Sequence, residues 1–289
     1  MGNQNFLKGN TNLINKGSNN AIIGNNNGIA YGDWNALIGN RNAAIGSYNG
    51  ALGDLNRLIG NNNLAAGNRN DLFGNLNAAF GDVNSVFGDL NAVRGNMNLI
   101  QGNGNLASGN SNGIIGGNNL INGNFNSVNG NQNSIDLLWN NIIGSKNGIE
   151  GNENLLVGND NGIIGNQNIG IGWLNFARGN QNVFEGNQNI INGNQNLVNG
   201  DKNELNGNKN GIKGNENGIA GNQNAIFGKD NLAFGNGNNI NGNINILKGS
   251  NNVIIGNNNA LVGELNAVKG DANSVLGNKN GVGGHLNKV

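Results

Sequence analysis

Glycine returns at every seventh position through most of this chain. Counting from Gly32 to Gly284 in steps of seven gives 37 positions, and 36 of them are Gly, with Leu137 as the exception. The fourth place of each heptad is Asn in all 37 cases. The sixth place is Ala, Val, Ile, Leu or Phe in 35 of 36, Gly170 being the exception, and the second place is Asn 22 times, Asp 6 times and Ser 3 times. The unit therefore reads Gly-Asn-x-Asn-x-Φ-x, where Φ is apolar. A glycine in every heptad costs about 1 kcal/mol each in a helix, so the repeat excludes helix and coiled coil.

Each place of the heptad has a structural meaning. Gly supplies a positive φ at a sharp corner, and the Asn, Asp or Ser that follows it can cap the turn through its side chain. Places four to seven form a short strand, on which alternation puts places four and six on one face. Because place six is apolar, that face is the core, and the Asn of place four points inward as well. We therefore predict an all-β fold, a parallel β-solenoid or β-roll.

The invariant Asn at place four predicts a buried ladder. Equivalent residues of adjacent coils lie about 4.8 Å apart, so stacked carboxylates would repel by roughly 3–4 kcal/mol per pair at an effective dielectric of 20. Stacked amides instead donate to and accept from one another, which satisfies each of them. The ladder is represented by Asn35, Asn42, Asn49, Asn161 and Asn168.

The spacing near the N-terminus indicates a 14-residue coil made of two heptads. The gaps between the first five glycines alternate between seven and eight, so an extra residue returns every second heptad; these are Gly2, Gly9, Gly17, Gly24 and Gly32. Aromatic residues at place three form two pairs, each two heptads apart, as stacking along one corner would give. The pairs are Trp34 with Tyr48 and Phe125 with Trp139. Three heptads per coil, a triangular 21-residue coil, stays open. We expect one continuous solenoid over residues 1–289, slightly irregular over 1–31 and regular over 32–289.

Two departures from uniformity are candidate interaction sites. Place seven is apolar eight times running, and this run either widens the core or forms an exposed patch and lateral interface. Its members include Ile38, Ile45, Leu52, Ile59, Phe73, Phe80 and Phe87. The repeat also lapses at an irregular spot made of Leu137, Leu138, Trp139, Gly170 and Trp173. A partner could act at these lapses, although kinks covered by their own apolar side chains are the simpler interpretation.

The composition argues against most kinds of catalytic, metal and nucleic-acid site. The 289 residues contain 16 Lys plus Arg and 16 Asp plus Glu, so a basic footprint for nucleic acid is missing. With no Cys and one His, His285, we expect no enzyme, no cofactor and no metal site. Periodic calcium binding, as in repeats-in-toxin rolls, needs ordered aspartates where this chain has mostly Asn. We expect no membrane insertion, and no signal peptide is visible at the N-terminus.

The heptad resembles the head repeats of bacterial haemagglutinins and trimeric autotransporter adhesins, which are Gly-x-x-small-x-apolar-x with two per coil. The segment GDVNSVFGDLNAVRG, residues 81–95, is similar to them, although the family favours Ser or Ala where this chain has Asn. The resemblance implies a trimeric, matrix-binding protein on a cell surface. We expect the coiled-coil stalk and the C-terminal barrel of that family to be missing from this chain.

These observations favour a non-enzymatic structural or adhesive solenoid, a rigid rod or fibre-forming protein that is extracellular or at the cell surface. We expect it to act by multivalent contact, to associate with itself end to end or laterally, and to bind a surface or matrix ligand. An intracellular scaffold and a viral fibre stay open. The alternative function is ice binding or water ordering, which the rigid repeat favours, although the chain has a single Thr, Thr11, and variable outward places.

Overall fold

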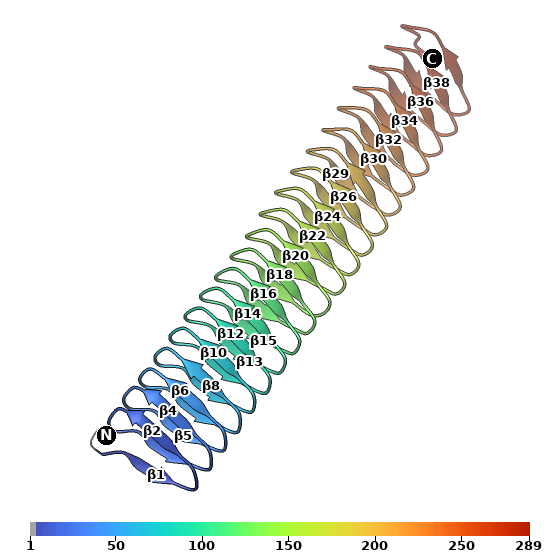
Figure 1. Cartoon of the computed structure of the whole chain (residues 1–289). Coiled ribbons are helices and arrows are strands. Elements are labelled where there is room, and N and C mark those ends of the chain that lie inside the picture. Colours follow the sequence, from blue (N-terminus) through green and yellow to red (C-terminus); the bar gives the residue numbers. More distant parts are fainter. Residues whose placement is uncertain (1–3) are drawn as a thin grey trace. The chain divides into compact units, whose positions relative to one another are not determined.

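The computed structural model describes residues 4–289, so Met1–Asn3 lie outside the described residues. The chain divides into two compact units, Met1–Lys146 and Asn147–Val289, which we call unit 1 and unit 2 and describe one at a time. The described residues form forty strands of three or four residues and no helix (Figure 1). The prediction of an all-β parallel β-solenoid is therefore confirmed. That both units form one continuous solenoid remains a prediction.

Unit 1 contains two parallel sheets, which we call the odd sheet and the even sheet after their strand numbers. Successive strands alternate between the two sheets (Figure 1). Each heptad forms half a coil and contributes one strand, and consecutive heptads contribute to different sheets. The odd sheet consists of β1 (Phe6–Lys8), β3 (Ala21–Ile23), β5 (Ala36–Ile38), β7 (Gly50–Leu52), β9 (Leu64–Ala66), β11 (Ala78–Phe80), β13 (Ala92–Arg94), β15 (Leu106–Ser108), β17 (Leu120–Asn122) and β19 (Ser134–Asp136). The even sheet consists of β2 (Leu13–Lys16), β4 (Gly28–Tyr31), β6 (Ala43–Ile45), β8 (Arg57–Ile59), β10 (Asp71–Phe73), β12 (Ser85–Phe87), β14 (Leu99–Gln101), β16 (Gly113–Ile115), β18 (Ser127–Asn129) and β20 (Asn141–Ile143).

Unit 2 repeats this arrangement with its own odd and even sheets. The odd sheet consists of β21 (Gly148–Glu150), β23 (Gly162–Ile164), β25 (Phe176–Arg178), β27 (Ile190–Asn192), β29 (Glu204–Asn206), β31 (Gly218–Ala220), β33 (Leu232–Phe234), β35 (Ile246–Lys248), β37 (Ala260–Val262) and β39 (Ser274–Leu276). The even sheet consists of β22 (Leu155–Val157), β24 (Ile169–Ile171), β26 (Val183–Glu185), β28 (Leu197–Asn199), β30 (Gly211–Lys213), β32 (Ala225–Phe227), β34 (Asn239–Asn241), β36 (Val253–Ile255), β38 (Ala267–Lys269) and β40 (Gly281–Gly283).

The strand register establishes the size of the coil. Leu37 pairs with Ala51, which lies two heptads further along the chain, and the same offset holds through both units. Only the first coils differ, because the offset between Ile22 and its partner Leu37 exceeds two heptads by one position. Two heptads per coil are thus confirmed, and the 21-residue coil is wrong.

The extra residue of the first coils has a definite place. It lengthens β2 and β4 to four residues each, so that Lys16 pairs with Tyr31 in the even sheet. Because both insertions fall at the same position of successive coils, they stack on each other and the register is kept.

The core lies between the two sheets of each unit. The middle residue of nearly every strand is buried, as are the inward Asn residues of place four. The corner glycines have positive φ, for example 135° at Gly32. A Cβ atom at Gly32 would overlap the carbonyl oxygen of Gly46 in the next coil, so Gly permits the coils to approach as well as the chain to turn.

Candidate functional site

The inward Asn residues form a continuous ladder within each unit. Asn42 donates its backbone N–H to the Asn27 Oδ1 atom at 2.8 Å and its side-chain amide to the Gly53 carbonyl at 2.7 Å. Its own Oδ1 atom accepts from the backbone and side-chain amides of Asn56 at 2.9 and 3.1 Å. The structure places Asn35, Asn49, Asn161 and Asn168 in the same buried arrangement. In the described residues no buried side-chain nitrogen or oxygen lacks a partner.

A second ladder runs along the exposed corners at place two. There the side-chain oxygen of one coil accepts from the backbone N–H of the preceding coil, as the Asp54 Oδ1 atom does from Asn40 at 2.6 Å. These bonds therefore join coils, whereas the sequence suggested that place two caps its own turn. Since place two only has to accept a hydrogen bond, Asp serves as well as Asn there. Place four must also donate to a buried carbonyl, which only the amide can do.

The outward residues at places five and seven form two parallel rows on each sheet. In the odd sheet of unit 1, every outward residue from β3 to β11 is uncharged and apolar or glycine. These residues are Ala21, Ile23, Ala36, Ile38, Gly50, Leu52, Leu64, Ala66, Ala78 and Phe80. Ile38 is 45% exposed and Leu52 55%. We call these ten residues the apolar face.

The even sheet of unit 1 has no equivalent stretch. Arg57 forms an ion pair with Asp71 at 2.8 Å and lies 4.7 Å from the centre of the Phe73 ring. Phe73 in turn stacks on Phe87, with 5.0 Å between ring centres. Charged groups therefore interrupt the apolar outward residues on this sheet.

The apolar place-seven run is divided between the two sheets. Ile38, Leu52 and Phe80 lie on the odd sheet, while Ile45, Ile59, Phe73 and Phe87 lie on the even sheet. None of these side chains is buried, so the run does not widen the core. Consecutive heptads face opposite ways because each coil contains two of them. The run is thus two patches, whereas the sequence suggested one.

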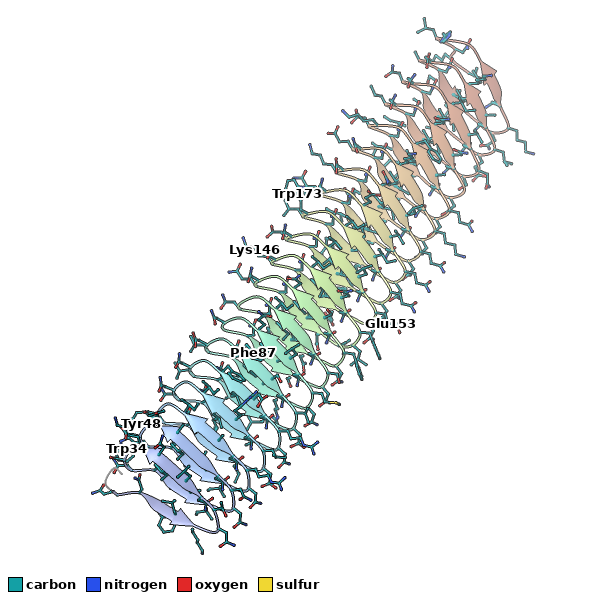
Figure 2. All side chains as sticks on the ribbon, in the orientation of Figure 1. Trp34, Tyr48, Phe87, Lys146, Glu153 and Trp173 are labelled. Carbon is teal, nitrogen blue, oxygen red and sulfur yellow. The ribbon has the colours of Figure 1, made fainter. Side chains whose placement is uncertain are left out.

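The corners hold the aromatic pairs that the sequence indicated. Trp34 stacks on Tyr48 with a 2° angle between the rings, and the two project beside one another in Figure 2. Phe125 stacks on Trp139 at 4.3 Å between ring centres. These residues occupy place three, where non-glycine residues adopt φ near +60° throughout the described chain. The heptad pattern gives no signal for that conformation, because place three is the most variable corner position.

The members of the irregular spot are divided between the two units. Leu137, Leu138 and Trp139 belong to a corner of unit 1, whereas Gly170 and Trp173 belong to unit 2. Leu137 takes the corner conformation of a glycine, with φ 84°, and is exposed. Trp173 occupies place two, and its backbone N–H donates to the Asn187 Oδ1 atom at 3.0 Å.

Gly170 is explained by packing. It pairs in register with Phe184, whose side chain is buried, and a Cβ atom at Gly170 would overlap the Phe184 ring. Phe184 thus fills the space that Gly170 leaves in the core of unit 2.

Charged groups form small exposed clusters. Glu216 lies 3.6 Å from Lys202 and 3.5 Å from Lys229. A hydrogen bond with Asp230, together with Lys229, lowers the pKa of Glu216. At the last coil, His285 accepts from the Asp271 backbone N–H at 3.2 Å.

Between residues 4 and 289, no group of three or more His, Cys, Asp or Glu side chains is arranged to hold a metal ion. That part of the chain also contains no helix long and apolar enough to span a membrane.

Comparison with known families gives one result. A family model for the grass antifreeze β-roll matches residues 1–88, 138–235 and 207–289. No curated protein matches the chain. The match supports a β-roll at the level of the repeat but gives no support to the resemblance to haemagglutinins and autotransporter adhesins. Fold and family together point to a non-catalytic protein. Because the matched segments cover more than half of its residues, the chain belongs to the grass antifreeze β-roll family.

Proposed function

We propose that this protein binds ice through the apolar face of unit 1. The observation that carries the proposal is the regularity of this face. From β3 to β11, two rows of uncharged side chains repeat once per strand, with about 4.8 Å between strands. The family match makes ice the ligand to test first.

An ice surface presents water molecules in parallel, evenly spaced rows. A protein that meets it must hold its own groups at fixed spacing, because disordered side chains would lose entropy on contact. Short paired strands supply this order, and both Asn ladders hold successive coils in register. The apolar face carries no charge to hold a hydration shell of its own. Its place-five row is small except at Leu64, being Ala21, Ala36, Gly50 and Ala78 elsewhere. The place-seven row beside it carries larger side chains except at Ala66.

The preference for the odd sheet rests on a difference in charge. The even sheet of unit 1 carries the ion pair between Arg57 and Asp71 across its outward surface, and both groups prefer liquid water to a rigid lattice. Adhesion to a surface or matrix ligand, which the sequence also suggested, gains no structural observation. An extracellular location remains a prediction.

The experiment compares two substitutions that differ only in the sheet. Ile38 and Ile45 occupy the same place of consecutive heptads and are 45% and 43% exposed. We expect Ile38→Lys to abolish most thermal hysteresis and ice-crystal shaping, because it places a hydrated ammonium within the apolar face. Ile45→Lys should leave both nearly unchanged.

Circular dichroism melts of both variants show whether the fold is kept. Loss of activity in Ile45→Lys but not in Ile38→Lys would move the site to the even sheet. A wild-type protein with neither hysteresis nor crystal shaping would reject ice binding altogether.

A further inference from the structure

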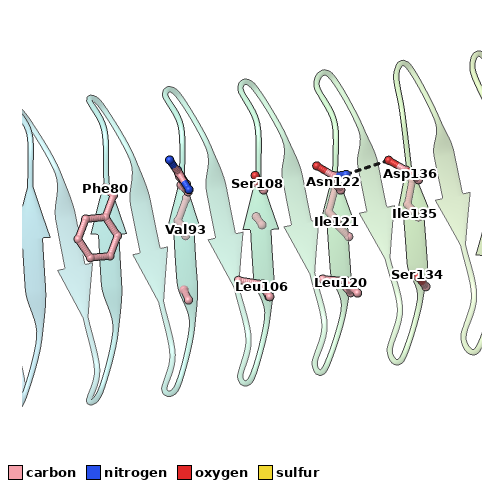
Figure 3. Close-up of a pocket in the computed structure, with 13 residues that line it drawn as sticks. Phe80, Val93, Leu106, Ser108, Leu120, Ile121, Asn122, Ser134, Ile135 and Asp136 are labelled. Carbon is pink, nitrogen blue, oxygen red and sulfur yellow. Dashed lines mark hydrogen bonds between the residues drawn. The ribbon is translucent and has the colours of Figure 1, made fainter.

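A shallow groove of about 580 Å³ lies on the odd sheet of unit 1, directly after the apolar face (Figure 3). It extends from Phe80 in β11 to Asp136 in β19. Its floor is formed by the middle residues of the strands between them, such as Ala107 and Ile121. The groove thus lies wholly within unit 1.

The two rims of the groove differ in chemistry. The place-five rim consists of Ala92, Leu106, Leu120 and Ser134, of which Leu106 and Leu120 are each 49% exposed. The place-seven rim begins with Phe80 and continues with Arg94, Ser108, Asn122 and Asp136. We call these last four residues the polar rim. Figure 3 shows Leu106 and Leu120 on one side and Ser108, Asn122 and Asp136 on the other.

The charged groups stand at opposite ends of the polar rim. Arg94 lies on β13 and Asp136 on β19, which is three strands further along the same sheet. At about 4.8 Å per strand, their backbones are roughly 14 Å apart, too far for them to pair within the chain. The Asp136 side chain accepts a hydrogen bond from the Asn122 side-chain amide at 3.0 Å. Arg94 forms none of the ion pairs found among the described residues.

This order of residues is complementary to itself. Consider a two-fold axis that lies in the plane of contact, parallel to the strands, midway between β15 and β17. It brings β13 of one copy opposite β19 of the other and keeps each rim opposite the same rim. Arg94 then meets Asp136 of the partner subunit twice, Ser108 meets Asn122 of the partner subunit twice, and the Leu106 and Leu120 side chains pack between them. Isologous contacts require such self-complementarity.

We propose that two copies of this chain associate face to face and antiparallel through the groove. The occupant is a second copy because the charges match under the two-fold axis. A ligand that carried only positive or only negative charge would face a group of the same charge at one end of the groove. The residues that match under the two-fold axis lie on four strands, β13 to β19, so the interface is below the usual size for stable complexes and the dimer is weak and reversible. This inference does not depend on ice binding.

The experiment uses charge reversal at both ends of the polar rim. Arg94→Asp places Asp opposite Asp136 of the partner subunit, and Asp136→Arg places Arg opposite Arg94 of the partner subunit. We expect each variant alone to weaken self-association by about tenfold or more in sedimentation equilibrium. An equimolar mixture of the two should associate again, because each end contact of the mixed dimer then joins one Asp with one Arg.

Arg69→Asp serves as the control for net charge, because it lies on an exposed corner away from both sheets. Its association should match that of the wild type. A wild-type chain that stays monomeric up to millimolar concentration would overturn the proposal. A mixture that stays as monomeric as its two components would overturn it as well. Circular dichroism of each variant shows separately that it is folded.

Discussion

At the scale of single residues, this fold depends on the difference between an amide and a carboxylate. The Asn161 side-chain amide donates to the Asn147 Oδ1 atom at 3.2 Å and to the Gly172 carbonyl at 2.9 Å. Its oxygen accepts from the Asn175 backbone N–H at 2.9 Å. An Asp in this place would still accept that bond, but its second oxygen would face the two oxygens to which the amide donated.

We therefore expect Asn161→Asp to destabilise unit 2 by about 3–5 kcal/mol, since it buries an unpaired charge. The matched control is Asn166→Asp in the exposed ladder. There the backbone N–H of Asn152 donates to the Asn166 Oδ1 atom at 2.9 Å, which Asp also accepts. Urea unfolding should show a change below about 0.5 kcal/mol for this control. Equal stability of Asn161→Asp and wild type would mean that the ladder amide is dispensable.

Place three carries backbone strain that the sequence did not indicate. Val83 has φ of 61°, although a left-handed conformation costs an L-residue roughly 1–2 kcal/mol and is least favourable for a β-branched one. Its backbone N–H donates to the Asn68 carbonyl at 2.8 Å, so the bond between coils holds the conformation. Short polar residues such as Asn tolerate it best.

Val83→Asn should raise the melting temperature, with a gain of about 0.5–1 kcal/mol, because Asn relieves the strain while the backbone bond stays. The same exchange at Val183, the first residue of β26, should lower stability, since Asn is disfavoured in strands. Opposite signs for one chemical change are the expected result in differential scanning calorimetry. A loss of stability in both variants would show that strain at place three is negligible.

At the scale of strands, core volume is shared between neighbouring coils. Gly170 on β24 and Phe184 on β26 face inward in register, one smaller and one larger than the usual core residue. The sum of the two volumes suits the space even though each departs from the repeat. The lapse at Gly170 is therefore a packing arrangement within one sheet.

Because Gly170 and Phe184 share this space, we expect substitutions at the two positions to have non-additive effects on the free energy of unfolding. Gly170→Val should destabilise strongly because its side chain would overlap the Phe184 ring, and Phe184→Val should cost about 2–4 kcal/mol through the cavity it leaves. The double variant restores two ordinary core residues and should lie within about 1 kcal/mol of wild type. Purely additive losses in a double-mutant cycle measured by urea unfolding would contradict the shared volume.

At the scale of the whole molecule, the protein is held together by neutral groups. The buried polar residues of the described chain are all Asn, and the charged residues lie at its surface. The buried Asn ladder, the backbone pairing and the apolar core contain no titratable side chain. Glu216 is exposed, and its hydrogen bond with Asp230 together with Lys229 holds its pKa below the ordinary value.

The stability of the protein should therefore vary little between pH 8 and about pH 5. Because the folded pKa of Glu216 lies below its ordinary value of 4.5, its contribution is present above that value and is lost as the pH falls through the folded pKa. Thermal melts should show a small loss at acid pH that Glu216→Gln removes. A steep decline between pH 8 and pH 5 would contradict this expectation.

The two proposed sites of unit 1 share one sheet. The apolar face ends at β11 and the groove begins there, so both open to the same side. A second copy seated on the groove would project above the plane of the sheet and obstruct an extended ice surface. If both proposals hold, thermal hysteresis per molecule should fall as protein concentration rises through the range of dimerisation, and the Arg94→Asp variant should lack this fall.

The heptad alone determines the fold, because each coil meets only its own copies. Strand positions, the inward Asn and the apolar core are all properties of one repeat placed on the next. The number of heptads per coil is not, because three heptads stayed open until the strand register established two. The tertiary structure decided the features that depend on contacts with atoms of the neighbouring coil. A corner Cβ would overlap the carbonyl of the next coil, the outer ladder joins coils, and Phe184 fills the space at Gly170. The division of the place-seven run between two sheets followed from the two-strand coil. It left the odd sheet uncharged from β3 to β11 and the even sheet crossed by an ion pair. Those contacts depend on the direction in which the coils stack. A repeating pattern of residue types does not specify that direction.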